Sequence, residues 1–163
     1  MNADDFIKRY GGIYEHSSWV AKHVHGVLGD TAADTELLAK LMADCVDNAS
    51  VEKQLELMRA HPDLAGKTAL AGELTADSTE EQTKAGLDQC TPAEFEKFQA
   101  LNSAYKEKFD FPFIMAVRDS SRLEILESFE RRLDNDYELE FETALQEIHK
   151  IARLRLAALE EGS

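Results

Sequence analysis

One histidine in the sequence stands in a context that suits acid–base chemistry. His61 comes directly before Pro62 in the stretch HPDLAGK at residues 61–67. Because proline disfavours helical geometry at the residue before it, we expect His61 to lie at a helix break, displayed rather than packed along a helix face. An unperturbed imidazole has a pKa of about 6.5, which suits proton transfer near neutrality. Considered without any relative, the residues favour a capping or buried structural role for His61 over a catalytic one.

A second group of polar residues follows a run of small ones. Ser78, Glu81 and Gln82 fall in the pattern Ser-x-x-Glu-Gln, which predicts a capping box in which Ser78 and Glu81 open a helix. A helix N-terminus also presents free N–H groups and a positive dipole end, which can hold a carboxylate or a polar ring. Glu81 could then orient His61, while the Gln82 amide offers both a donor and an acceptor. The residues alone favour the capping role, and both roles can coexist.

A cation falls on the apolar side of the last predicted helix, which we expect to run from near Asp136 to about Leu159. Arg155 lies on the apolar stripe of this helix, which helical spacing defines. Snorkelling or a structural ion pair explains a guanidinium on that face as well as an anion held in a pocket does. The other members of the stripe are Tyr137, Phe141, Leu145, Ile148, Ala152 and Leu159.

Other candidate residues are weaker. The turn FDFPFI at residues 109–114 is either core packing between helices or a pocket wall whose free backbone groups contact a flat ring. The stretch YEH at residues 14–16 could contribute to a site, although a solvated helix end is favoured. The acidic stretch ELE at residues 138–140 is expected to be a solvated face. His23 and His25 do not share a helix face, so we expect no metal site there.

The charge and length of the chain limit its class. The formal net charge is −14 over 163 residues, which argues against nucleic acid and an anionic membrane surface, because both require clustered cations. No apolar run is long enough to cross a bilayer, and the acidic first residues lack a signal-peptide pattern, so a cytoplasmic location is expected. We predict one domain over residues 1–163. Cys45 and Cys90 are isolated and are expected to be reduced.

Composition and helix-start signals predict an all-α fold of about eight helices with a long C-terminal helix. Valine and isoleucine are sparse beside alanine, leucine, glutamate and lysine, a balance that favours helices. Residues 66–77 are expected to form a connector. We expect helices to begin at or near Asp4, Ser17, Asp30 or Thr31, Ser50, Ser78, Thr91, Ser121 and Asp136.

Taken in order, these motifs resemble those of the 2-oxo-4-hydroxy-4-carboxy-5-ureidoimidazoline (OHCU) decarboxylase family. The HPDLAGK stretch at residues 61–67 is similar to one family signature, and FPFI at residues 111–114 and IARLRL at residues 151–156 match later ones. YGGIYEHS at residues 10–17 resembles the bacterial branch, although Ser18 stands where a proline is common. The resemblance covers nearly the whole chain. Between residues 61–67 and 111–114 lies a further family signature, which is matched by Ser78, Glu81, Gln82, Ala85, Gly86 and Leu87.

The resemblance implies an all-α homodimer, without metal or organic cofactor, that decarboxylates this small ureide to (S)-allantoin in the last step from urate. It implies that His61 is the general acid or base and that Glu81 is its partner. The substrate's own conjugated ring can accept the electrons left by carbon dioxide, so no cofactor is required. The residues that the resemblance places around the substrate are Pro62, Ser78, Gln82, Phe113, Ile114, Met115, Ala116, Val117 and Arg155.

Two other classes of function remain compatible with the residues. An acidic, helix-rich chain with a long last helix also suits a non-enzymatic interaction protein, which would have no need for His61, Glu81 and Arg155 together. An enzyme of the same fold could act on a different cyclic ureide, because selectivity depends on pocket geometry. The joint presence of the three residues favours the decarboxylase.

Overall fold

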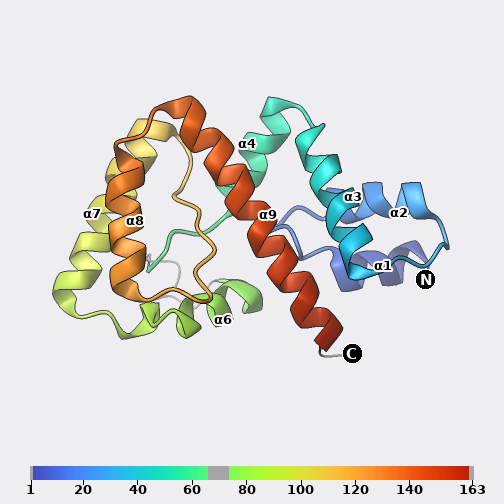
Figure 1. The fold of residues 1–163 in the computed structure, drawn as a ribbon, viewed down its shortest axis with the longest axis horizontal. Helices are drawn as coiled ribbons and strands as arrows, with labels where there is room; N and C mark the ends of the chain where they lie inside the picture. Colours follow the sequence, from blue (N-terminus) through green and yellow to red (C-terminus); the bar gives the residue numbers. More distant parts are fainter. Residues whose placement is uncertain (1, 66–73, 162–163) are drawn as a thin grey trace. The chain divides into compact units, whose positions relative to one another are not determined.

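The structure is a computed structural model that describes residues 2–65 and 74–161, and within them it is all-α (Figure 1). The described residues form eight α-helices and one short 3-10 helix, without strands. The predicted all-α class and long C-terminal helix are therefore confirmed. The chain divides into two compact units, residues 1–61 with 148–163 (unit 1) and residues 62–147 (unit 2). The prediction of one domain stays a prediction.

Unit 1 is built from four helices and the end of a fifth. Helix α2 packs against α1 and α3, and α3 packs against α4 (Figure 1). The core comes from one face of each helix, with Val24, Val46 and Leu57 fully buried, as amphipathic spacing requires. The helices are α1 (Ala3–Tyr10), α2 (Trp19–Leu28), α3 (Thr35–Asp47), α4 (Val51–Ala60) and the C-terminal part of α9 (Tyr137–Glu161).

Unit 2 has an aromatic core between α7 (Pro92–Phe109) and α8 (Arg122–Leu133), which lie side by side (Figure 1). The rings of Phe113 and Phe129 stack with centroids 3.9 Å apart, and Tyr105 meets both edge-on. The aromatic turn after α7 therefore fills the core, as one of the two interpretations of that turn predicted. The remaining elements are α6 (Ala76–Lys84), η1 (Leu87–Gln89) and the N-terminal part of α9.

Several predicted helix starts are confirmed by their caps. Ser50 accepts a hydrogen bond from the backbone of Lys53, and Thr91 and Ser121 form complete capping boxes with the glutamates three residues later. Asp136 accepts from the backbone of Leu139 at the start of α9. At these positions one strong capping residue precedes an apolar run, so the local signal is sufficient.

At three other helix starts the predicted capping residue is wrong. Helix α2 follows Ser18, whose side chain makes no cap hydrogen bond, while the Ser17 hydroxyl donates to the Glu15 carbonyl instead. Helix α3 begins after Asp34 rather than near residues 30–31. Helix α6 begins after Thr75, so Ser78 lies inside it and does not cap it. Residues 66–73 of the predicted connector lie outside the described residues.

Candidate active site

His61 lies where the sequence placed it, at the end of helix α4. Its backbone is extended, with φ −74° and ψ 138°, and its N–H donates to the Met58 carbonyl at 3.2 Å. The helix break before Pro62 is therefore confirmed. The residue is only 8% exposed, and within residues 2–65 and 74–161 the ring Nε2 atom has no hydrogen-bond partner. A buried polar atom without a partner costs free energy, so its presence suggests that it serves a ligand.

The environment of the His61 ring keeps it neutral. Burial is the largest influence and lowers the pKa of His61 to about 4, because a charged imidazolium would be poorly solvated. The Glu15 carboxylate acts in the opposite direction, while the charge of Arg155 and, more weakly, His16 lower the pKa further. At neutral pH the imidazole therefore has one protonated and one unprotonated nitrogen, ready to accept or pass on a proton.

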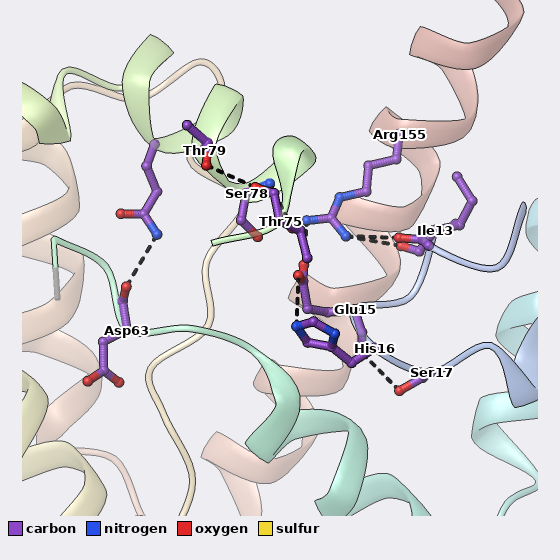
Figure 2. A network of polar contacts seen from close by, with 11 residues as sticks. Ile13, Glu15, His16, Ser17, Asp63, Thr75, Ser78, Thr79 and Arg155 are labelled. Carbon is purple, nitrogen blue, oxygen red and sulfur yellow. Dashed lines mark hydrogen bonds and ion pairs between the residues drawn. The ribbon is translucent and has the colours of Figure 1, made fainter. Parts of the chain in front are cut away.

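Arg155 forms a buried ion pair with Glu15. Its Nη2 atom lies 2.8 Å from Glu15 Oε2, and the two side chains are 3% and 1% exposed. The Nη1 atom donates to the carbonyls of Gly12 and Ile13 at 3.3 and 3.4 Å, and Figure 2 shows the guanidinium directed at Ile13. The structural ion pair, one of the roles predicted for Arg155, is thus present. The interpretation of residues 14–16 as a solvated helix end is wrong for Glu15.

The turn that carries Glu15 is held by further contacts. His16 adopts a left-handed backbone with φ 49°, a conformation that histidine tolerates better than most residues. Its ring Nε2 lies 3.8 Å from Glu15 Oε1 (Figure 2). On the other side, the Tyr14 hydroxyl lies 2.8 Å from His149 Nδ1, and His149 Nε2 lies 2.9 Å from Asp47 Oδ1. Burial raises the pKa of Tyr14, so its hydroxyl stays protonated.

In unit 2, Gln82 binds the backbone that follows Pro62. Its Oε1 accepts from the Ala65 N–H at 3.0 Å, and its Nε2 donates to the Asp63 carbonyl at 3.2 Å. Three side chains of α7 hold the same backbone segment or the Asp63 carboxylate: Gln99, Asn102 and Lys106. Gln82 therefore orders the chain beside the histidine signature, and its predicted contact with substrate stays a prediction.

Ser78 and Glu81 both belong to α6 in unit 2. The Ser78 backbone donates to the Thr75 hydroxyl at 3.2 Å, and the Thr79 hydroxyl donates to the Thr75 carbonyl at 2.9 Å (Figure 2). The Ser78 residue is 4% exposed, whereas Glu81 is half-buried. The predicted capping box between these two residues is wrong, because Thr75 takes the capping position.

Two hydrogen bonds to charged side chains anchor the backbone of the predicted pocket segment at residues 113–117. Arg132 Nη1 donates to the Ile114 carbonyl at 2.6 Å, and the Ala116 N–H donates to Glu147 at 3.2 Å. Arg132 in turn pairs with Glu140 at 2.9 Å. Glu140 is fully buried, so the interpretation of residues 138–140 as a solvated face is wrong for that residue. Two backbone groups of the segment are therefore already bonded within unit 2.

The remaining residues of the segment vary in burial. Phe113, Ile114 and Val117 are buried, while Met115 and Ala116 are half-buried. The Phe113 ring also lies under the Arg132 guanidinium, 4.4 Å from its central carbon. The segment is thus rigid on the side that meets the aromatic core, as a pocket wall must be.

The predicted residues divide between the two units. His61 and Arg155 come together in unit 1, with Glu15 as a partner that the sequence interpretation did not select. The partnership of Glu81 with His61 stays a prediction. Among residues 2–65 and 74–161 no three His, Cys, Asp or Glu side chains gather as metal ligands. The residues on unit 2 are Pro62, Ser78, Glu81, Gln82, Phe113, Ile114, Met115, Ala116 and Val117.

A pocket of about 470 Å³ in unit 1 lies apart from these residues. It is lined by α2, α3 and the start of α4, including Trp19, Cys45 and Lys53, and none of the predicted site residues contributes to it. Burial raises the pKa of Cys45, which makes its thiol a poor nucleophile. The chemistry is therefore better supported at His61 than in this pocket.

No described helix combines the length and the apolar composition needed to cross a membrane. Helix α9 is long enough, but acidic and basic residues occur along its whole length.

Comparison with known proteins identifies relatives along almost the whole chain. The family model described as OHCU decarboxylase matches residues 1–157. An OHCU decarboxylase of Halalkalicoccus jeotgali is 47% identical over 154 residues, 94% of this chain and 84% of that protein. One from Haloferax volcanii is 45% identical over 157 residues, 96% of this chain and 90% of that protein. A crystal structure of (S)-allantoin synthase is 32% identical with a TM-score of 0.77, and the match covers 98% of this chain and 50% of that one.

Proposed function

Because the chain belongs to the OHCU decarboxylase family, we propose that it decarboxylates 2-oxo-4-hydroxy-4-carboxy-5-ureidoimidazoline to (S)-allantoin in urate degradation. The relatives of 45–47% identity are named for this activity. The observation within the chain that best supports the proposal is the buried, neutral His61, whose Nε2 atom has no partner among the described residues.

For this reaction the protein must orient the substrate and deliver one proton, and no cofactor is required. The bond between the ring carbon and its carboxylate breaks, carbon dioxide leaves, and the electron pair enters the conjugated ring. A proton then adds to one face of the ring, which sets the (S) configuration. The protein must hold the carboxylate out of the ring plane and deliver that proton from one side.

His61 supplies the proton in this proposal. A free-enzyme imidazole with a pKa of about 4 is neutral before substrate binds. The substrate is an anion, and a negative charge beside the ring raises the pKa of an imidazole, as the Glu15 carboxylate already does. Substrate binding would therefore let His61 gain a proton and act as the general acid. General acid–base catalysis of this kind typically contributes about 10²–10⁴ in rate.

Other residues would bind and orient the ureide. Arg155 offers a desolvated guanidinium whose plane is fixed by Glu15 and two backbone carbonyls, which suits recognition of a planar polar group. We assign Glu81 the role of fixing the His61 tautomer or holding the ureido arm. Pro62, Ser78, Gln82 and the segment at residues 113–117 complete the proposed binding site.

The homodimer, the lack of a cofactor and the cytoplasmic location implied by the family resemblance belong to the same proposal. Sedimentation equilibrium of the purified chain tests the first, since it distinguishes a mass near 18.3 kDa from twice that value. Activity after exhaustive dialysis against a chelator tests the second. Fractionation of the source cells tests the third.

The activity itself is tested by circular dichroism on substrate made in the cuvette. Urate oxidase and hydroxyisourate hydrolase generate the unstable ureide, with or without the protein. Rapid loss of the substrate signal with lasting (S)-allantoin ellipticity is expected. If well-folded protein leaves the decay unchanged and the product racemic, the proposal fails, and turnover of another cyclic ureide or a non-enzymatic role takes its place.

A further inference from the structure

We propose that Glu15 is a positioning residue of this reaction, which orients the Arg155 guanidinium and supplies the negative charge that balances the buried site around His61. The inference rests on the proposed function and deepens it, because it makes turnover depend on the charge and position of Glu15. Glu15 is 1% exposed and lies 2.8 Å from Arg155 Nη2. Both residues of this ion pair belong to unit 1.

The geometry around the Arg155 guanidinium supports this role of Glu15. Arg155 Nη2 contacts the Glu15 carboxylate, and Nη1 contacts the carbonyls of Gly12 and Ile13. The two carbonyl contacts are long, at 3.3 and 3.4 Å, whereas the carboxylate contact is short at 2.8 Å and charge-assisted. The carboxylate is therefore a stronger restraint on the guanidinium plane than either carbonyl is. Removal of the carboxylate therefore takes away a stronger restraint than either carbonyl provides.

The balance of charge around His61 also supports this role of Glu15. Two buried cations, Arg155 and a protonated His61, would repel each other in a poorly solvated site. Glu15 supplies the compensating negative charge, and its carboxylate raises the pKa of His61 against the lowering by burial, Arg155 and His16. A proton on His61 during turnover is thus less costly with Glu15 present than without it.

The turn at residues 14–17 is built around Glu15. Tyr14 is fixed by His149, which is fixed by Asp47, and the Ser17 hydroxyl donates to the Glu15 carbonyl at 2.9 Å. The left-handed backbone of His16 lies directly after Glu15. Strained conformations of this kind persist where the surroundings over-determine them, often near functional sites. Tyr14 before Glu15 and the Glu15 carbonyl are therefore held in place by side chains of unit 1.

The test compares Glu15→Gln with Glu15→Asp in the coupled assay, with substrate made near neutral pH and transferred by stopped-flow pH jump. Glu15→Gln keeps the shape and removes the charge, so kcat/KM is expected to fall by roughly 10–100-fold near neutrality through misplacement of Arg155. Because a general acid acts in its protonated form, kcat/KM should fall on the alkaline side of the pKa of His61 in the free enzyme. Loss of the Glu15 charge lowers that pKa and should move this limb to lower pH. Glu15→Asp keeps the charge and should retain the wild-type limb, with a smaller loss of rate from its shorter reach.

Glu130→Gln is the matched control, because Glu130 forms a half-exposed ion pair with Lys97 in unit 2. It should leave the rate and the pH limb unchanged. Folded Glu15→Gln protein with wild-type kcat/KM and an unmoved pH limb would overturn the inference while leaving the proposed function intact. If Glu15→Gln does not fold, full activity of Glu15→Asp overturns it instead. Wild-type protein without any turnover would overturn the proposed function, and this inference with it.

Discussion

Arg155→Met removes the cation that balances Glu15 in the interior of unit 1. The two side chains are 3% and 1% exposed and 2.8 Å apart, so the substitution leaves a desolvated carboxylate without its charged partner. Breaking a buried pair from one side costs about 3–5 kcal/mol. A chain of this size loses about 2–4 °C in Tm for each kcal/mol. The expected fall in Tm is therefore roughly 6–20 °C.

The double variant Glu15→Leu with Arg155→Met separates charge from packing. Replacing both members of a buried pair by apolar groups is often neutral or stabilising, so most of the lost stability should return. Urea denaturation of both variants near neutral pH, followed by far-UV circular dichroism, measures the difference. Lys40→Met is the control, because its ion pair with Asp44 is 70% and 50% exposed and such pairs contribute about 0–1 kcal/mol. An Arg155→Met variant as stable as Lys40→Met would refute the reasoning.

Three further predictions concern stability. The pKa of His61 is about 4 when folded, below its ordinary value of 6.5, so the stability due to its neutral form is present above pH 6.5 and lost as the pH falls toward 4. His61→Gln should flatten the decline of unfolding free energy in this range by up to about 1.4 kcal/mol per pH unit, and parallel urea titrations with equal slopes would contradict this. Tyr105→Phe removes a buried hydrogen bond of 2.6 Å to Glu140 and should cost about 1.5–3 kcal/mol; an unchanged urea midpoint would exclude that contribution. Thr91→Ala removes the cap of α7 and should cost about 1 kcal/mol, which thermal denaturation can resolve.

Features encoded by neighbouring residues could be predicted from the sequence. The extended backbone of His61 follows from the proline after it, and Ser50 and Thr91 cap the helices that they precede. Local signals failed where several capping residues compete. Thr75 precedes Ser78 by three residues, and the structure places the helix start at the earlier of the two.

The residues next to a charged side chain in the sequence do not show whether that side chain is buried. Glu15 and Arg155 are 140 positions apart, so nothing near Glu15 distinguishes it from a solvated glutamate. The one usable signal is Arg155 itself, since a cation that is buried on an apolar stripe, rather than snorkelling to solvent, needs a counter-ion. Glu140 was misread for a similar reason, because its partners Arg132 and Tyr105 lie on other helices.

The central claim is that His61 handles the proton in the decarboxylation, and a comparison of wild type with His61→Asn tests it most directly. Both proteins would be assayed by circular dichroism with substrate generated in the cuvette, after far-UV spectra confirm equal helicity. Wild type is expected to produce optically active (S)-allantoin rapidly. His61→Asn is expected to have a rate lower by at least about 10²-fold, with a racemic product from uncatalysed decay. Near-normal rate and (S) product from the folded variant would contradict the role of His61.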